Sequence, residues 1–202
     1  GTSGVTIFLR KQMIYGGTVN LGGIQVTSDI MKAFNISFEA AERIKNLHGG
    51  LISISRDDRD MIEIERPLHY SDDDRILISR ADLIAVIRPR IEEILEELRD
   101  QLDVAGFRHL NAKKIILTGG GSQLPGLFDI GSKILGSPVR IGKPMRIQGL
   151  PHATNGPEFA ASVGLALHAG YPQDECWDFH VPFGRARFAN VNGVFKWFAE
   201  NW

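Results

Sequence analysis

A run of apolar residues leads directly into three glycines in the segment KKIILTGGGSQLPGL, residues 113–127. Ile115 to Thr118 predict a short strand, and residues 127–136 predict a helix after the turn. Glycines at the end of a strand remove every Cβ and leave backbone N–H groups free to face a flat or anionic ligand. The alternative is a tight strand-to-helix connection that needs glycine for its dihedral angles. Both interpretations place a strand before a helix, as in an α/β protein.

The bulk composition is that of an ordinary globular protein. The 202 residues are 43% hydrophobic and 23% charged, which is sufficient for one large domain or two small ones. The net charge of −1 gives no basic field that would attract nucleic acid, so we set nucleic-acid binding aside. One cysteine, Cys176, forms neither an internal disulfide nor a zinc site. The sequence predicts no membrane-spanning segment and no signal peptide.

Hydrophobic periodicity predicts the other elements. Strands over residues 5–9 and 13–19 form a hairpin, with Lys11 and Gln12 in its turn. Ser79 begins the longest helix, and Gly106 ends it. We also predict helices over residues 26–34, 38–48 and 156–170, an edge strand over 61–66 and a short strand over 138–142.

Residues with strong positional preferences predict how the helices begin and end. We expect Thr27 or Ser28 to cap the first helix and Ser37 to cap the second. The pair Gly49-Gly50 should end the second helix with a left-handed cap. Pro89 lies inside the longest helix, where it removes one backbone hydrogen bond and should bend the helix.

Two further places have both a functional and a structural interpretation. The opening Gly-Thr-Ser-Gly is either a flexible end or a phosphate-binding turn, in which backbone amides and the hydroxyls of Thr2 and Ser3 meet phosphate oxygens. Glu42 and Lys45 lie three residues apart on a helix, which by itself indicates a solvated ion pair. No Lys-Ser or Lys-Thr follows the three glycines, so a P-loop is excluded. The histidines predict no metal site, and we find no catalytic residues.

The last residues have the pattern of an amphipathic helix. Val191, Val194, Phe195, Phe198 and Trp202 fall on one helical face, and Trp197 lies on its flank. An aromatic helix that follows an irregular segment suits the interface between membrane and water. The alternative is a terminal helix that packs on the core of its own domain.

Seven segments, taken in order and spacing, resemble the family of the bacterial cell-division protein FtsA, a membrane-tethered homologue of actin. These segments are GTSGVTIF, LGGIQVTSDIMKAF, SFEAAERIKNLHG, IRPRIEEILEELRDQL, IILTGGGSQLPGL, PVRIGKPMRIQGLP and GPEFAASVGLAL. The tail VNGVFKWFAENW resembles the membrane-targeting helix of the same family.

The resemblance implies an actin-like ATPase (ribonuclease H-like) fold, in which two lobes close around ATP and Mg²⁺. This chain resembles the second lobe. Residues 1–50 and 105–171 would form the nucleotide-binding subdomain, and residues 51–104 a smaller subdomain that binds the FtsZ C-terminal peptide. Residues 172–187 would be a linker, and residues 188–202 the amphipathic membrane-targeting helix.

The resemblance also implies site residues. The nucleotide site would comprise Gly1, Thr2, Ser3, Gly22, Gly23, Glu42, Lys45, Gly119, Gly120, Gly121 and Ser122. Arg90 and Glu93 match the helix implicated in FtsZ binding, with Arg75 and Arg80 as weaker candidates for an acidic peptide. Membrane contact would come from Val194, Phe195, Trp197, Phe198 and Trp202.

The function that this resemblance implies is that of a cell-division adaptor. It would tether FtsZ polymers to the cytoplasmic face of the inner membrane at the division site, with ATP controlling its self-association and other division proteins as partners. Because the first lobe's phosphate loop and catalytic residues are missing here, we expect weak or no ATP binding and no turnover by this chain alone. The alternatives are another actin-like kinase or ATPase, or a PilM-like adaptor of pilus assembly.

Overall fold

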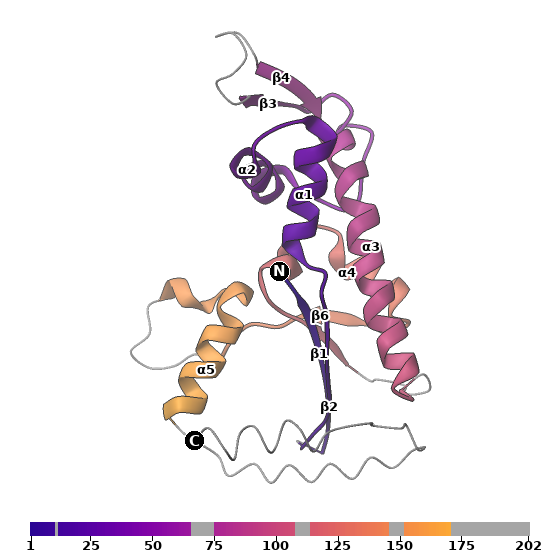
Figure 1. Ribbon diagram of the computed structural model, residues 1–202, viewed down its shortest axis with the longest axis vertical. Helices are drawn as coiled ribbons and strands as arrows, with labels where there is room; N and C mark the ends of the chain where they lie inside the picture. Colours follow the sequence, from indigo (N-terminus) through magenta and orange to yellow (C-terminus); the bar gives the residue numbers. More distant parts are fainter. Residues whose placement is uncertain (11, 66–74, 108–113, 146–151, 171–202) are drawn as a thin grey trace, which may run out of the picture.

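The computed structural model describes residues 1–10, 12–65, 75–107, 114–145 and 152–170. Helices α1 (Gly23–Phe34) and α2 (Phe38–His48) lie in the upper part of the molecule in Figure 1, and α3 (Arg80–Val104) runs beside α1 toward the lower part. The N-terminal hairpin extends below α1, and α5 (Ala160–Gly170) lies to one side. The predicted linker and tail, residues 172–202, lie outside the described residues.

The N-terminal hairpin confirms the prediction. Strands β1 (Ser3–Leu9) and β2 (Gln12–Val19) pair antiparallel, with Ser3 opposite Val19 and a register shift after Ile7. Gln12 was wrongly predicted in the turn, because it pairs with Leu9. The chain reverses at Arg10, whose φ is 51°.

Helix α1 begins earlier than its apolar period predicts, at Gly23. The cap at Thr27 or Ser28 is therefore wrong, because both residues lie inside the helix. Instead, the N–H of Gly22 donates a 2.8 Å hydrogen bond to the side-chain oxygen of Gln25. The hydroxyl oxygen of Thr27 lies 2.9 Å from the Gly23 carbonyl oxygen one turn earlier.

Helix α2 begins as predicted and ends differently. The N–H of Ala40 donates to the Ser37 hydroxyl at 3.1 Å, which confirms Ser37 as its cap. The predicted left-handed cap is wrong, because Gly49 is extended, with φ −61° and ψ 150°. Glycine is required there for another reason: a Cβ would overlap the carbonyl oxygen of Lys45.

Strand β3 (Met61–Glu65) confirms the predicted strand, but its partner β4 (Arg75–Ser79) was missed. The two pair antiparallel, with Ile62 opposite Ile78 and Ile64 opposite Ile76. One face of this hairpin is apolar and packs on the helices, while Met61 and Leu77 are exposed on the other face.

Helix α3 follows β4 without a loop. Asp82 N–H donates to the Ser79 hydroxyl at 3.0 Å, so Ser79 caps the helix as predicted. The helix continues through Pro89 for 25 residues. Its end at Gly106 is confirmed, because that glycine has the left-handed φ of 87°.

The predicted strand, glycine turn and helix are confirmed near residues 115–134. Strand β5 (Ile115–Leu117) pairs in parallel with β6 (Val139–Ile141), and α4 (Leu127–Ile134) connects them. The glycines form a short 3₁₀ helix, η1 (Gly120–Gln123), before α4 begins. A second 3₁₀ turn, η3 (Pro157–Phe159), leads into α5.

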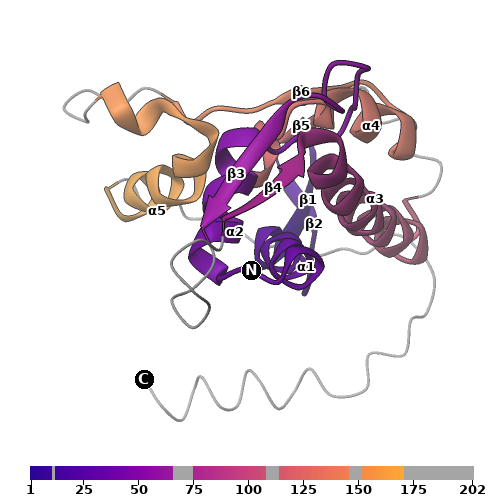
Figure 2. The same cartoon turned by 90° about the horizontal axis from the view of Figure 1, so that it is seen from above.

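One hydrophobic core joins the helices to the β3–β4 hairpin. Figure 2 shows α1 and α3 lying side by side beneath β3 and β4. The largest fully buried side chains are Ile30, Leu51, Leu83, Ile87, Val26 and Thr27. Deleting such a side chain costs about 2–5 kcal/mol when its site cannot collapse, so this core holds α1 and α3 in fixed positions. The division into two subdomains stays a prediction.

Candidate functional site

The glycine turn is held by hydrogen bonds at both ends. The N–H of Gly119 donates to the Pro157 carbonyl at 3.0 Å. The hydroxyl of Ser122 donates to the Gly119 carbonyl at 2.7 Å, and Gln123 donates to the Glu158 carboxylate at 2.8 Å. Because η3 anchors the turn from outside, the backbone of the glycines has a fixed path.

Only one of the three glycines is required by the backbone. Gly119 has φ 92°, which side chains other than glycine adopt at a cost. Gly120 and Gly121 have no such dihedral. A Cβ on Gly120 would come no closer than 3.9 Å to Glu158, and one on Gly121 would have no atom of the described chain within 4 Å. Their bare backbone therefore faces open space, which is the arrangement that a flat ligand requires.

The opening residues pack against the start of α1. The hydroxyl of Ser3 donates to the Leu21 carbonyl at 2.8 Å. A Cβ on Gly22 would approach Gly1 and Thr2 to 3.0 Å, so glycine allows the two backbones to lie together. The predicted residues Gly1, Thr2, Ser3 and Gly22 are thus neighbours. The Ser3 hydroxyl, however, is engaged by the protein's own backbone.

The predicted residues Glu42 and Lys45 form part of a network between α2 and α1. The Lys45 ammonium lies 2.6 Å from the Glu42 carboxylate, and it donates to the Thr27 hydroxyl at 2.7 Å and to the Gly23 carbonyl at 3.2 Å. Thr27 also donates to Glu42. The pair is therefore more than a solvated ion pair, since the Lys45 side chain is only 11% exposed. Thr27 was predicted as a cap and missed as a member of this network.

Glu42 remains available to a ligand. Its side chain is 41% exposed, whereas Lys45 is covered. Burial alone would raise the pKa of Glu42, but the hydrogen bonds from Lys45 and Thr27 outweigh burial, so the pKa is lowered from its ordinary value. A carboxylate held ionised in this way can accept hydrogen bonds from hydroxyl groups.

The glycine turn and the end of α2 are joined through the backbone. The N–H of Leu51 donates to the Pro125 carbonyl at 2.9 Å. The ideal Cβ of Gly126 would lie 2.8 Å from the Ile52 side chain, so the loops after α2 and after η1 are in close contact. In the described part of the chain, no hydrogen bond runs directly from residues 119–122 to Glu42 or Lys45.

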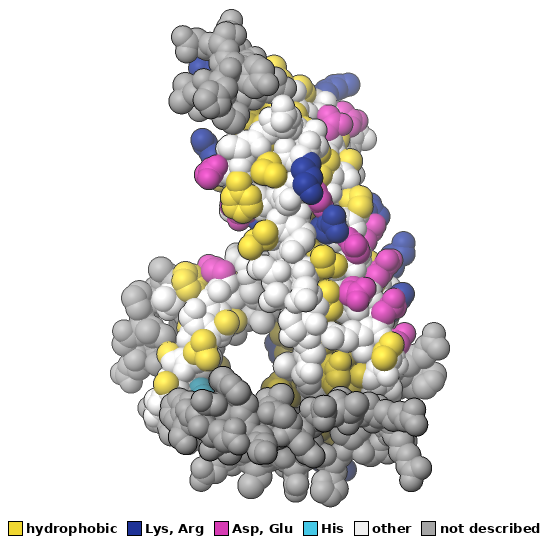
Figure 3. Space-filling model, viewed as in Figure 1, with side chains coloured by type: hydrophobic (Ala, Val, Ile, Leu, Met, Phe, Trp, Pro, Cys, Tyr) yellow, Lys and Arg dark blue, Asp and Glu magenta, His cyan; other side chains and the backbone are white. Residues whose placement is uncertain are grey.

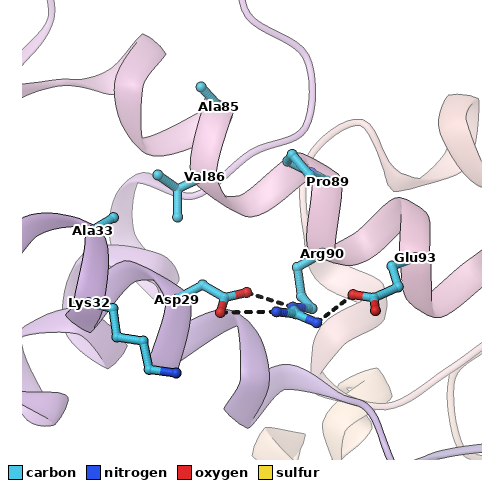
Figure 4. Close-up of a pocket in the computed structure, with 8 residues that line it drawn as sticks. All are labelled: Asp29, Lys32, Ala33, Ala85, Val86, Pro89, Arg90 and Glu93. Atoms are coloured by element: carbon cyan, nitrogen blue, oxygen red, sulfur yellow. Dashed lines mark hydrogen bonds and ion pairs between the residues drawn. The ribbon is translucent and has the colours of Figure 1, made fainter.

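Arg90 and Glu93 line a groove between α1 and α3, with a volume of ≈ 520 Å³ (Figure 4). Arg90 forms two hydrogen bonds to Asp29 of α1, Nε to Oδ2 at 2.6 Å and Nη2 to Oδ1 at 3.1 Å, and a further ion pair with Glu93. Asp29 was missed. Its position one turn before Lys32 in a helix was the available sequence signal, but it did not identify a partner on another helix.

The weaker candidates are also engaged. Arg75 Nη1 lies 2.8 Å from Glu63 across the β3–β4 pair. Arg80 donates to the His48 carbonyl at 3.2 Å and lies 3.6 Å from the buried Asp57. Figure 3 shows acidic and basic side chains alternating along the outer flank of α3.

The described residues contain neither a metal-binding cluster nor a membrane-spanning helix. Among the described residues, no three His, Cys, Asp or Glu side chains lie close enough to hold a metal ion. None of the described helices combines the length and the apolar character needed to cross a membrane. The predicted membrane contacts, Val194, Phe195, Trp197, Phe198 and Trp202, lie outside the described residues.

The chain is similar to cell-division proteins of several bacteria. The FtsA of Agrobacterium fabrum is 38% identical over 208 residues, covering 100% of this chain and 46% of that protein. The FtsA of Rhizobium meliloti is 38% identical over 194 residues, covering 96% of this chain and 43% of that protein. The chain therefore spans less than half the length of these relatives.

Solved structures establish the fold. MreB5 of Spiroplasma citri bound to ADP has a TM-score of 0.60 at 17% identity, over 84% of this chain and 51% of that one. The PilM-PilN type IV pilus biogenesis complex has a TM-score of 0.58 at 24% identity, over 85% and 44%. These neighbours confirm the predicted actin-like ATPase fold. Since the family model for cell division protein FtsA matches residues 1–164, this chain belongs to the FtsA family.

Proposed function

We propose that this chain belongs to an adaptor that ties FtsZ polymers to the cytoplasmic membrane at the division site, with ATP controlling self-association. Family membership over residues 1–164 is the observation on which this proposal rests, because that match includes both the glycine turn and the groove between α1 and α3. Other division proteins would join the same assembly.

The geometry of the glycine turn supports the nucleotide part of the proposal. Gly120 and Gly121 leave a bare surface that their own fold does not require, and a Cβ on either would enter largely open space. The adenine ring and ribose would lie on this backbone, and Glu42 would accept hydrogen bonds from ribose hydroxyls.

The phosphates would meet the backbone near Gly1, Thr2 and Gly22, which lie together. Mg²⁺ would be held by the part of the family's length that this chain does not span, because the described residues offer no cluster that would hold it. Lys45 would act by positioning Glu42, because three protein groups already accept hydrogen bonds from its ammonium.

The membrane part of the proposal rests on the sequence of residues 188–202. A single short amphipathic helix gives marginal and reversible attachment, and many such helices along one polymer bind through avidity. An adaptor that self-associates and also binds polymeric FtsZ would therefore attach firmly only where both polymers are present.

Recruitment of fluorescent FtsZ polymers to liposomes tests the adaptor function as a whole. The wild-type chain should bring FtsZ into the floating fraction, whereas a Trp197→Glu, Phe198→Glu variant should leave both proteins in solution. Flotation of the double variant with the lipid would refute the tail as anchor. Flotation of the wild-type chain without FtsZ would refute the adaptor role.

A further inference from the structure

The hydroxyl of Thr27 is fully buried where α1 meets α2. Its oxygen lies 2.5 Å from Glu42 Oε2, 2.7 Å from the Lys45 ammonium and 2.9 Å from the Gly23 carbonyl oxygen. A threonine inside a helix can satisfy its hydroxyl on its own helix, at the carbonyl one turn earlier. The shorter contact with Glu42, on another helix, is therefore not needed to satisfy the buried hydroxyl.

The chemistry of the three groups fixes the direction of these hydrogen bonds. The Lys45 ammonium is a donor only, so the Thr27 oxygen accepts from it. The hydroxyl has a single proton, and the Glu42 carboxylate is both the closer and the charged acceptor within its reach. Since a hydrogen bond to an ionised group is about twice as strong as one between neutral groups, the proton belongs to Glu42.

The two carboxylate oxygens of Glu42 have unequal partners. Oε2 accepts from Thr27 at 2.5 Å and from Lys45 at 2.6 Å. Within the described chain, Oε1 has only an exposed contact with the Asn46 amide at 3.4 Å. Oε2 is thus fully engaged by the protein, whereas Oε1 has capacity for a stronger donor. The free acceptor of this site is a particular atom, Oε1.

The network also holds Glu42 in place relative to the start of α1. Lys45 donates to the Gly23 carbonyl at 3.2 Å, and the preceding residue, Gly22, lies with its backbone against Gly1. One cluster therefore connects the carboxylate to the turn that is proposed to meet phosphate. Glutamate has a flexible side chain, and holding it in one orientation before binding reduces the entropy that a ligand would otherwise have to overcome.

We propose that Thr27 is a positioning residue for ribose recognition: its hydroxyl holds Oε2 of Glu42, so that Oε1 accepts a hydrogen bond from a ribose hydroxyl of the nucleotide. This inference rests on the proposed function, which supplies the nucleotide. It assigns the selectivity of this position to the sugar, because an oriented acceptor that meets no hydroxyl is left unpaired when the site closes. The competing explanation is that Thr27 only joins α1 to α2.

The affinities of ATP and of dideoxyATP, the analogue without ribose hydroxyls, test this role. Both are measured by competition against a fluorescent ATP analogue, in a protein that spans the whole family length. The wild type should prefer ATP by about tenfold, and Thr27→Val should reduce this preference to about twofold. Thr27→Ser keeps the hydroxyl and should restore the preference. A purely structural role would weaken both nucleotides equally and leave their ratio unchanged.

Asn46→Ala is the matched control on the other oxygen. It removes the Asn46 contact with Oε1 and leaves both hydrogen bonds to Oε2 in place. The preference for ATP should therefore stay at about tenfold. A loss of preference as large as that in Thr27→Val would overturn the proposal, because the orientation of Glu42 would then not depend on Oε2.

The pKa of Glu42 gives a readout in this chain without any nucleotide. Burial raises the pKa of Glu42, but the hydrogen bonds from Lys45 and Thr27 outweigh burial and keep it below its ordinary value. Thr27→Val should therefore raise the pKa, and Thr27→Ser should not. NMR of the Glu42 carboxyl carbon during a pH titration measures it. An unchanged pKa in Thr27→Val would show that the hydroxyl does not hold the carboxylate.

The outcomes separate this inference from the proposed function. A wild-type protein of the whole family length that binds neither nucleotide would refute the nucleotide part of that function, and the role of Thr27 with it. Equal wild-type affinity for the two nucleotides would overturn the ribose contact of Glu42 and leave nucleotide binding intact. A wild-type preference that persists in Thr27→Val would overturn the role of Thr27 alone.

Discussion

The guanidinium of Arg90 forms a bidentate pair of hydrogen bonds with the carboxylate of Asp29, although the two residues are 61 positions apart in the sequence. The pair joins α3 to α1 and lines the groove between these helices. Both side chains are about one quarter exposed, at 28% and 24%. The contact is therefore a partly protected ion pair with good geometry, stronger than an ordinary surface salt bridge.

A double-mutant cycle on this pair should show coupling. We expect Arg90→Ala and Asp29→Ala each to lower the free energy of unfolding by about 1–2 kcal/mol, and the coupling between them to be about 1 kcal/mol. Urea denaturation followed by circular dichroism measures all four chains. Strictly additive losses would mean that the pair contributes no stability of its own.

This pair also limits what a charge reversal at residue 90 can reveal. Arg90→Glu would place a third carboxylate beside Asp29 and Glu93. Loss of peptide binding in that variant would then report repulsion between the two helices as much as a lost contact. The resemblance to FtsA identified residue 90, but the partner 61 residues away was beyond sequence reasoning, because no local pattern specifies which helices pack together.

Local signals predicted the elements well where one residue type has one physical role. The hydroxyls of Ser37 and Ser79 cap helices as predicted, because the following backbone donors have no other nearby acceptor. Strand β4 was missed, since RILIS is five residues long and directly abuts the cap of α3. Its identity as a strand comes from pairing with β3, which a single short segment does not reveal.

Tertiary contacts explain the remaining errors. Threonine is a common capping residue, but Thr27 is buried within α1, where its hydroxyl contacts the Gly23 carbonyl and the Glu42 carboxylate. Gly49 was predicted from its dihedral freedom, and close packing on the Lys45 carbonyl is the actual reason for it. The nucleotide residues were grouped by resemblance, and only the structure shows which glycines the fold itself does not need.

Substitutions in the glycine turn should separate backbone strain from ligand binding. Gly119→Ala should lower the free energy of unfolding by about 1 kcal/mol or more, because φ 92° is strained for alanine. Gly120→Ala and Gly121→Ala should leave stability within about 0.5 kcal/mol of the wild type, since their Cβ atoms enter open space. Thermal and urea unfolding measure the three variants side by side.

Gly120 and Gly121 also give a prediction for nucleotide affinity. In a protein that spans the whole family length, Gly120→Val and Gly121→Val should weaken the binding of a fluorescent ATP analogue by about tenfold or more, because a side chain then occupies the ligand's surface. The alanine variants are the control for folding. Unchanged affinity in both valine variants would remove the glycine turn from the nucleotide site.

The Glu42 network predicts a pH dependence of stability. The folded-state pKa of Glu42 is lowered from its ordinary value of 4.5, so the ionised carboxylate stabilises the fold above about pH 4.5. This contribution is lost as the pH falls through the folded-state pKa. Glu42→Gln should therefore cost up to about 1 kcal/mol at pH 7 and clearly less at pH 3.5, a modest effect because the side chain is 41% exposed. Equal losses at both pH values would contradict this assignment.

Gly49 and Gly50 form a matched pair at the end of α2. Both are buried, but a Cβ on Gly49 would overlap the Lys45 carbonyl, whereas one on Gly50 would meet the side chains of Ile84 and Arg80 at ordinary distances of 3.7 and 3.9 Å. Gly49→Ala should lower the free energy of unfolding by about 2 kcal/mol or more, because the obstacle is backbone. Gly50→Ala should cost less than about 1 kcal/mol. Because Lys45 holds Glu42, Gly49→Ala should also reduce the pH dependence described for that carboxylate, and its retention would show that the network tolerates a displaced helix end.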